Sequence, residues 1–177
     1  MKYKFSFYGN TILKRREEMK VVIYLNNDSV DTIREVIEHF VSYNFSSFIV
    51  FTTNVAEKRD ELNYFKLNNI KVVFLNKKEN DSTSSSLLKI KGSLSEVRFF
   101  MVYNVGACEI DLDKMLNAHK KSQRLVTLAQ AEERLLSLAL FEEEIFDYLQ
   151  DGNSLEQDTI KRIGEDCELS LLKFQAK

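Results

Sequence analysis

Short apolar runs alternate with amphipathic segments along this chain. Val21–Leu25, Ser47–Thr53 and Ile70–Leu75 are rich in β-branched and aromatic residues. These runs predict strands. The nearly continuous apolar character of Ser47–Thr53 and Ile70–Leu75 is typical of strands covered on both faces, as in a parallel sheet. The sequence therefore predicts that these two strands are buried.

The segment after Asp28 and Ser29 has the spacing of an amphipathic helix, and either residue can cap its free N–H groups. Its apolar residues recur with a period of about 3.6, so one face of the helix is expected to be buried. These residues are Val30, Ile33, Val36, Ile37, Phe40 and Val41. Further helices are predicted at Val55–Asn63, Asp111–Ser122, Glu144–Gln150 and Ser154–Asp166.

The remaining strands are predicted at Lys2–Tyr8, Leu87–Lys91, Val97–Tyr103, Leu125–Gln130, Arg134–Phe141 and Glu168–Phe174. The polar stretch Asn76–Ser86 is interpreted as a loop. Alternation of strands and helices predicts a three-layer α/β/α sandwich with a mostly parallel, Rossmann-like sheet. With no internal repeat and no linker, residues 1–177 are expected to form a single domain. Ligands of such sheets bind beyond the carboxyl ends of the strands, and Tyr103–Cys108 follows one such end.

Charge and composition exclude several classes of partner. The net charge is −2 and both signs are mixed along the chain, which gives no electrostatic basis for binding nucleic acid or an anionic membrane. No stretch approaches the roughly 18 apolar residues of a membrane span, and Met1–Gly9 lacks the apolar region of a signal peptide. Cys108 and Cys167 have no metal-ligand spacing. We therefore expect two reduced thiols in a cytoplasmic protein.

The segment Tyr103–His119 reads YNVGACEIDLDKMLNAH and follows an apolar run. It resembles the metal-site segment of the sugar-phosphate nucleotidyltransferases, most closely the glucose-1-phosphate cytidylyltransferases. In these proteins a strand precedes Y-G-D-G-V, a short acidic stretch and a helix with histidine at this spacing. Further segments match in order, namely Asn44–Thr53, Ser84–Lys89, Phe141–Leu149, Leu155–Ile160 and Glu165–Leu169. The resemblance covers about residues 33–174 and implies the nucleotidyltransferase-type fold.

The resemblance also implies a substrate pocket, of which this chain keeps only a vestige. Its residues are Gly9, Thr11, Lys20, Ser85, Ser86, Asn104, Val105, Glu156 and Asp158. Nucleotidyl transfer needs a glycine-rich phosphate cradle, a cationic side chain and a divalent cation held by carboxylates. Here the cradle arginine is missing, the second phosphate lysine is Val22, and the metal-binding aspartate is Val105. Valine cannot ligate a hard cation, which takes oxygen ligands.

Further departures lie elsewhere along the chain. The family's T-G-G is Ser84–Ser86 and its next arginine is Leu87. Between Gln130 and Arg134 the family carries a longer sugar-phosphate segment, and its second metal aspartate lies beyond the point that corresponds to Lys177. We therefore predict a degenerate, catalytically inactive protein with no catalytic residues, no metal and no other cofactor.

Such a protein acts by binding, in a regulatory or scaffolding role in nucleotide-sugar or polysaccharide biosynthesis. Such a regulatory or scaffolding role implies a protein partner or a homo-oligomer. One alternative is a residual nucleotide or sugar-phosphate binding module, and another is a divergent sugar-1-phosphate nucleotidyltransferase. A last one is new chemistry in the same cleft, for which the candidates are Glu109, Glu156, Asp158 and His119.

Simple structural interpretations account for the other polar features. His39 and His119 each lie on a predicted helix, where a lone histidine is more often structural than a ligand. Glu109, Asp111 and Asp113 are interpreted as residues that begin a helix, since its dipole favours acids there. The serine run Ser82–Ser86 is expected to be a flexible loop.

Overall fold

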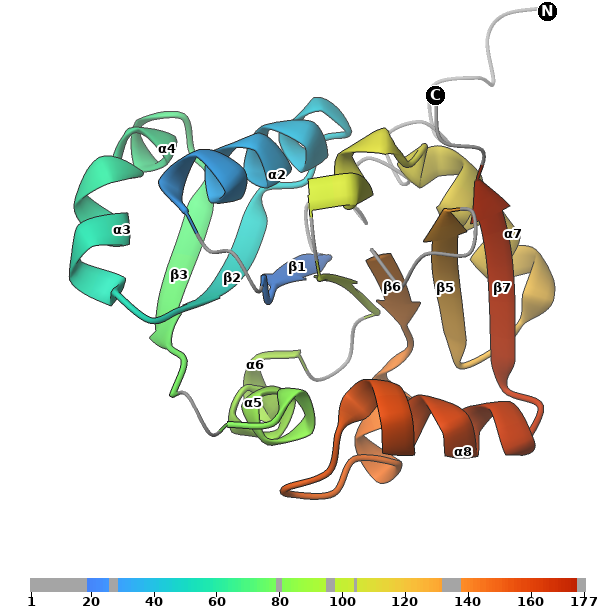
Figure 1. Ribbon diagram of the computed structural model, residues 1–177. Coiled ribbons are helices and arrows are strands. Elements are labelled where there is room, and N and C mark those ends of the chain that lie inside the picture. Colours follow the sequence, from blue (N-terminus) through green and yellow to red (C-terminus); the bar gives the residue numbers. More distant parts are fainter. Residues whose placement is uncertain are drawn as a thin grey trace, which may run out of the picture.

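The computed structural model describes residues 19–25, 29–78, 81–94, 98–103, 105–131 and 138–174 (Figure 1). The predicted strand Lys2–Tyr8 lies outside these residues. A seven-stranded sheet has the order β3-β2-β1-β4-β6-β5-β7. Its strands are β1 (Lys20–Ile23), β2 (Ser47–Thr52), β3 (Lys71–Asn76), β4 (Phe99–Val102), β5 (Val126–Ala131), β6 (Leu138–Phe141) and β7 (Leu169–Phe174).

The sheet is mostly parallel, as the alternation of elements predicts. β3, β2, β1 and β4 all run in one direction, with Val22 of β1 opposite Ile49 on one side and Met101 on the other. β6 runs antiparallel to its neighbours β4 and β5, and β5 pairs with β7 in parallel. The antiparallel pairing of β5 with β6 confirms the two adjacent strands predicted there.

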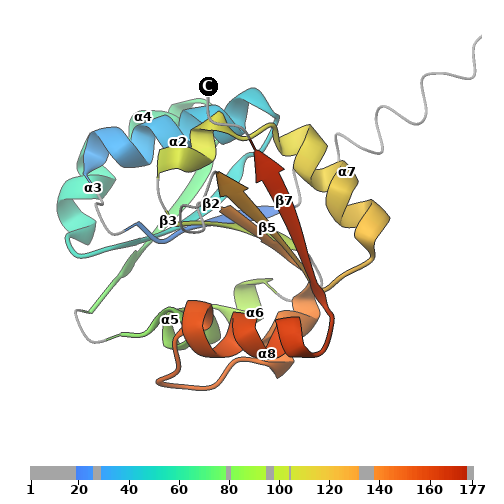
Figure 2. The same cartoon turned by 45° about the vertical axis from the view of Figure 1, so that its right-hand side comes forward.

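Helices cover both faces of the sheet, which gives three layers (Figure 2). One layer contains α2 (Val30–Ser42), α3 (Val55–Glu61), α4 (Tyr64–Leu67), the 3-10 helix η1 (Val105–Glu109) and α7 (Leu112–Ser122). The other contains α5 (Thr83–Lys89), α6 (Lys91–Leu94), the 3-10 helix η2 (Glu143–Asp147), the π-helical turn η3 (Leu155–Thr159) and α8 (Ile160–Glu165). The predicted fold class is confirmed.

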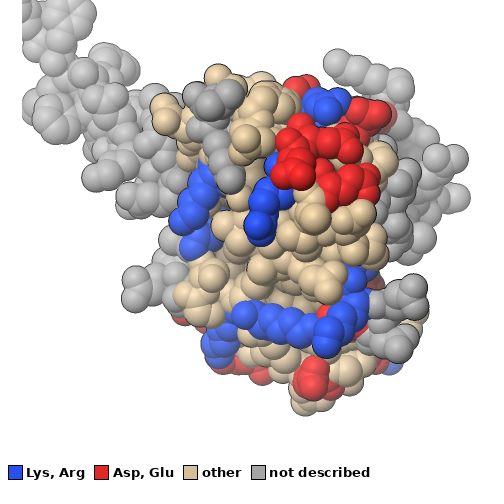
Figure 3. Space-filling view, turned by 90° about the vertical axis from the view of Figure 1, so that its left-hand side faces the viewer, with Lys and Arg blue, Asp and Glu red and all other residues tan. Residues whose placement is uncertain are grey.

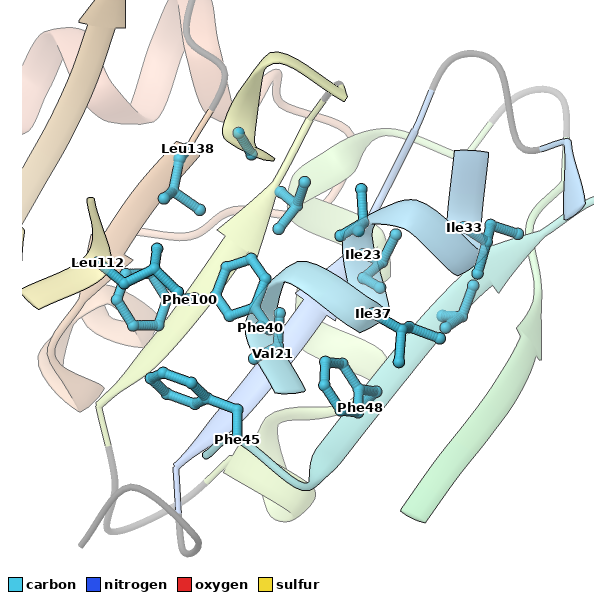
Figure 4. Packing of buried hydrophobic residues seen from close by; sticks show 14 of the residues in the cluster. Val21, Ile23, Ile33, Ile37, Phe40, Phe45, Phe48, Phe100, Leu112 and Leu138 are labelled. Atoms are coloured by element: carbon cyan, nitrogen blue, oxygen red, sulfur yellow. The ribbon is translucent and has the colours of Figure 1, made fainter. Parts of the chain in front are cut away.

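A separate hydrophobic core fills each space between sheet and helices. In the α2 core, the rings of Phe40, Phe45 and Phe100 pack edge to face with centroids 5.4 Å apart (Figure 4). Successive side chains of a strand point to opposite faces. Val21 of β1 therefore packs into this core and Val22 packs into the core beneath α5 and α8. Because both faces of such a strand are buried, its consecutive residues are apolar and form a continuous apolar run in the sequence.

The amphipathic helix predicted after Ser29 is confirmed. The Ser29 side chain caps α2 by accepting a hydrogen bond from the Thr32 N–H at 3.2 Å. Four of the six apolar residues predicted to share one face are fully buried, and they are Ile33, Val36, Ile37 and Phe40.

Three local predictions are wrong. Ile70–Leu75 was expected to be buried on both faces, but Val73 is 39% exposed, and β3 lies at the edge of the sheet that the described strands form. Leu87–Lys91 was expected to be a strand and Ser82–Ser86 a flexible loop, but α5 spans Thr83–Lys89. The reason is a local cap, because the Ser82 hydroxyl accepts a hydrogen bond from the Ser85 N–H at 3.1 Å.

The connections place a topological switch point between β1 and β4. β1 leads into α2 on one face of the sheet, whereas β3 leads through α5 and α6 on the other face before β4. β1 connects to β2 on one side of it, whereas β4, its neighbour on the other side, leads through α7 to β5, so the two connections run in opposite directions along the sheet. A crevice at that point is the general ligand position of open α/β sheets.

Candidate functional site at the switch point

Two tyrosines directly follow the strands that meet at the switch point. Tyr24 follows β1 and Tyr103 follows β4, and both are buried. The Tyr24 hydroxyl donates to the Asp81 carbonyl at 3.2 Å. Lys77, which follows β3, holds its Nζ 4.4 Å from the centre of the Tyr24 ring and donates to the Leu25 carbonyl at 3.1 Å. The carboxyl edge of the sheet thus presents an aromatic pair and one cation.

The serine-rich helix α5 and the segment entering η3 form a wall beside these tyrosines. The Thr83 hydroxyl donates to Glu156 at 3.4 Å. The Ser85 hydroxyl donates to the Asp151 carboxylate at 2.6 Å and accepts from the Gly152 N–H at 3.0 Å. Two residues expected in the pocket, Ser85 and Glu156, therefore come from distant parts of the sequence to one place.

Buried hydroxyl groups distinguish this region. The side-chain oxygens of Tyr103, Ser84 and Thr159 are buried and have no hydrogen-bond partner among the residues that the structure describes. Leaving a hydroxyl buried and unpaired costs about 1–3 kcal/mol. Of these groups, the Tyr103 hydroxyl lies at the carboxyl end of β4, where a polar ligand would complete its hydrogen bonds, whereas Ser84 and Thr159 are fully buried.

Electrostatics keep both tyrosines protonated at neutral pH. Burial, followed by the nearby Glu156 carboxylate, raises the pKa of Tyr103 well above its usual value. Burial also raises the pKa of Tyr24, although the nearby Ser86 hydroxyl opposes the shift. Both phenols therefore retain their proton and are able to donate hydrogen bonds.

Comparison with known proteins identifies the fold. No protein-family profile and no curated protein matches the chain. Among solved structures, a provisionally assigned glucose-1-phosphate thymidylyltransferase from Bacillus anthracis aligns with a TM-score of 0.67 and 6% identity, over 88% of this chain and 86% of that one. HddC from Yersinia pseudotuberculosis aligns with a TM-score of 0.65 and 11% identity, over 88% and 90%. The chain has the sugar-phosphate nucleotidyltransferase fold.

Other vestigial-pocket residues are placed differently within this nucleotidyltransferase fold. Glu156 and Asp158 also serve the start of η3, because Glu156 accepts from the Ser154 hydroxyl at 3.0 Å and Asp158 from the Ser154 N–H at 2.8 Å. Lys20 begins β1, at the opposite edge of the sheet from Tyr103, and its Nζ contacts the Ser93 carbonyl.

The rest of the predicted pocket has little structural description. Gly9, Thr11 and Asn104 lie outside the described residues, and Val105 is described only as the start of η1. Within the described ranges, no three His, Cys, Asp or Glu side chains come together as metal ligands would. In the same ranges, no helix has the length and apolar character that crossing a bilayer requires.

The nucleotidyltransferase-like fold also contains a buried polar chain that the sequence analysis missed. His119 is 1% exposed, with Nδ1 2.8 Å from the Thr127 hydroxyl and Nε2 2.9 Å from Glu142. Glu142 is 2.7 Å from the Arg98 guanidinium. Burial would raise the pKa of Glu142, but the hydrogen bond from His119 and the charge of Arg98 outweigh it and lower that pKa.

Three residues of this buried polar group, His119, Glu142 and Arg98, line a cavity of about 570 Å³. The cavity lies at the amino end of β4, whereas the switch point lies at the carboxyl end of that strand. Thr127 is fully buried, so its hydroxyl cannot act as a nucleophile on a bound molecule. The packed role predicted for His119 agrees with this geometry. In the sequence, only its place on the apolar side of α7 indicated a packed role for His119. Its partners Thr127 and Glu142 lie 8 and 23 residues further along the chain, so the sequence did not reveal these contacts.

Two further polar residues, Cys108 and Asp111, lie in the segment that follows β4. Burial, followed by Glu35 and Glu109, raises the pKa of the Cys108 thiol to about 11. A thiol of that pKa is almost fully protonated at pH 7 and is a poor nucleophile. Asp111 caps α7 by accepting from the Lys114 N–H at 3.0 Å, as expected for an acid that begins a helix.

Proposed function

We propose that this chain is a nucleotidyltransferase-like protein that acts by binding and does not transfer nucleotidyl groups. Its role is regulatory or scaffolding, in nucleotide-sugar or polysaccharide biosynthesis. The observation that carries the proposal is the connection that leaves β1 at the switch point. It runs from Tyr24 to Ser29 (YLNNDS) and contains no glycine, lysine or arginine.

A phosphate cradle needs backbone N–H groups that converge on the anion, and glycines allow that close approach. Large side chains at Tyr24 and Leu25 are buried here instead. The residue that corresponds to the family's metal aspartate is Val105, which begins η1. The proposal is therefore supported by a connection after β1 that offers no phosphate cradle and by the valine at the position of the cation ligand. The cradle residues that the resemblance implies, Gly9 and Thr11, lie outside the described residues.

A second candidate function is retention of a nucleotide or sugar phosphate without turnover. It is favoured by the Tyr103 hydroxyl, which has no hydrogen-bond partner among the described residues, and by Lys77 at the strand ends. Among the structural neighbours, the Bacillus anthracis protein was solved with sucrose and HddC with GMP-PN. These ligands define the classes to test on this chain.

An activity assay tests the first proposal. Purified protein is incubated with glucose-1-phosphate, each of CTP, UTP, GTP and dTTP in turn, and Mg²⁺ or Mn²⁺, and pyrophosphate release is measured. We expect no release above a heat-denatured sample. Sustained pyrophosphate release with one nucleotide, matched by formation of the sugar nucleotide, would overturn the proposal.

A thermal-shift series with the same compounds tests the second candidate. A ligand at 100 times its Kd stabilises the folded state by about 2.7 kcal/mol, which raises the melting temperature by several degrees. A shift without turnover favours the binding module. If no compound gives a shift, the search turns to a protein partner and to self-association, measured by sedimentation at several concentrations.

A further inference from the structure

The edge of the sheet at β3 carries a second, differently built surface. A groove of about 340 Å³ lies on the face of β2 and β3 that α5 and α6 leave partly uncovered. Apolar side chains from both strands line it, and these are Ile49, Phe51, Val73 and Leu75. We call this surface the β3 groove. Val73 is among the few exposed large apolar side chains in the described part of the chain.

The charged side chains that line the β3 groove are all basic. Its lining includes Lys20, Lys71 and Lys89 and no aspartate or glutamate. Lys89 is 2.6 Å from the Asp81 carboxylate, so its charge is partly neutralised. The Lys20 Nζ contacts the neutral Ser93 carbonyl, and neither Lys20 nor Lys71 has an ion-pair partner among the described residues. On the side of the molecule shown in Figure 3, basic side chains border an uncharged central area, while acidic ones gather higher up.

The backbone of β3 adds a directional feature. β3 ends the strand order, so β2 is its one neighbour among the described strands. Lys71 and Lys77 direct their N–H groups to carbonyls of the β2 side. Alternate residues of a strand direct their backbone groups to opposite sides, so Val72, Phe74 and Asn76 direct theirs to the open edge. Such an edge is a template for one more strand.

We infer that the β3 groove binds an extended acidic segment of a partner protein, which pairs with β3 and adds a strand to the sheet. A segment whose apolar and acidic residues share one face of the added strand fits both features, because Lys71, Val73 and Leu75 lie on one face of β3 and the side chains that meet them must be of both kinds. The inference deepens the proposed binding function and rests on it, since it names the surface and chemistry of the partner.

Charge argues against an internal occupant. Residues 1–18 are strand-like near their start, but they carry five lysines and arginines, Lys2, Lys4, Lys14, Arg15 and Arg16, against two acids, Glu17 and Glu18. The segment therefore has the same sign as the groove, and like charges disfavour its docking there. An acidic partner has the complementary sign.

Fluorescence anisotropy with a labelled heptapeptide, Glu-Thr-Val-Thr-Val-Thr-Asp, tests the inference on the full chain, because its acids and valines fall on one face of a strand. The control peptide replaces every acid with lysine. We expect saturable binding of the acidic peptide alone, weakened by raising NaCl from 50 to 500 mM because salt screens exposed charges. Absence of saturable binding at millimolar protein would overturn the inference.

Two substitutions separate charge from strand pairing. Lys71→Glu reverses an exposed charge of the groove, and Asn76→Pro removes one N–H from the open edge of β3. Each is expected to weaken peptide binding about tenfold or more. Lys161→Glu on α8 makes the same charge change on an exposed site away from the groove and should leave binding unchanged. Equal weakening by all three would indicate non-specific electrostatics and overturn the inference.

Other occupants give different outcomes. If the chain alone forms a dimer that Asn76→Pro converts to a monomer, a second copy occupies the edge and the acidic partner is wrong. If Phe5→Asp with Phe7→Asp raises peptide affinity, the chain's own first residues occupy the groove. Neither outcome depends on the activity assay, so failure of this inference and failure of the proposed function are distinguished.

Discussion

At the scale of single residues, the Tyr103 hydroxyl is the sharpest probe of the switch-point site. It is buried without a hydrogen-bond partner among the described residues. Tyr103→Phe removes that unpaired group and keeps the ring, so we expect the free energy of unfolding to stay unchanged or rise by about 1 kcal/mol. Urea unfolding followed by far-ultraviolet circular dichroism measures it. A clear loss of stability would contradict the unpaired state of the hydroxyl.

The same variant separates a binding site from a packing defect. If Tyr103 donates to a nucleotide or sugar phosphate, Tyr103→Phe reduces the ligand-induced thermal shift while the stability of the free protein is maintained. If the shift persists unchanged, the hydroxyl does not contact that ligand.

Glu142 gives a prediction for pH dependence. Its pKa in the folded protein is lower than its ordinary value of 4.5, so its contribution to stability is fully present above pH 4.5 and is lost as pH falls through the folded pKa. Glu142→Gln weakens the contacts with His119 and Arg98 and is expected to lower the free energy of unfolding at pH 7 by about 1–3 kcal/mol. The difference from the natural chain should shrink below pH 4.5.

Unfolding by urea at several pH values between 3 and 7 checks this expectation. Glu144→Gln is the matched control, because Glu144 lines the same cavity, is exposed and has no hydrogen bond or ion pair among the described contacts. A destabilisation by Glu142→Gln that stays constant from pH 7 to pH 3 would show that the carboxylate charge is not its cause.

At the scale of elements, composition predicts a strand better than it predicts the strand's surroundings. β1 and β3 come from similar apolar runs, yet β1 is buried on both faces and β3 is an edge. The difference arises from the order of strands in the sheet, which neighbouring residues do not encode. The helix α5 was missed for a related reason, because a serine run followed by Leu87 and Leu88 has no clear period, and its cap at Ser82 decides its structure.

The residues of the candidate site also divide into those that the sequence predicted and those that only the fold reveals. Ser85 and Glu156 were named because their segments resemble a known family, and the structure brings them together through α5 and η3. Tyr24 and Lys77 carried no such signal. Their contact exists because β1 and β3 end at the same edge of a parallel sheet, so only the topology reveals it. Lys20 shows the opposite relation between sequence and fold. The resemblance to the family assigned it to the pocket, but it begins β1 and so lies at the amino end of that strand, away from Tyr24 and Tyr103.

At the scale of the whole molecule, one strand joins the two cores. In β4, Phe99 packs against Phe141 and Phe146 in the core beneath α5 and α8, while Phe100 packs against Phe40 and Phe45 in the α2 core. Both rings are fully buried. Since β4 lies at the centre of the sheet, loss of packing on either face is transmitted to the strand that both faces share. The two layers of helices should therefore unfold together, as the predicted single domain requires.

Phe99→Ala and Phe100→Ala test this coupling from opposite faces. Truncating a buried phenylalanine costs about 3–5 kcal/mol, a large part of the 5–15 kcal/mol that stabilises a typical domain. We expect each variant to lose stability in that range and to unfold in one transition. The natural chain has no tryptophan, so tyrosine fluorescence reports tertiary packing and circular dichroism reports the helices. Coincident curves show a single cooperative unit.

Leu171→Ala is the control for these two variants. At a site that is 55% exposed, it should change stability by no more than about 0.5 kcal/mol. Two separate transitions in Phe99→Ala alone would mean that the layer of α5 and α8 unfolds independently, and that the chain does not behave as one domain.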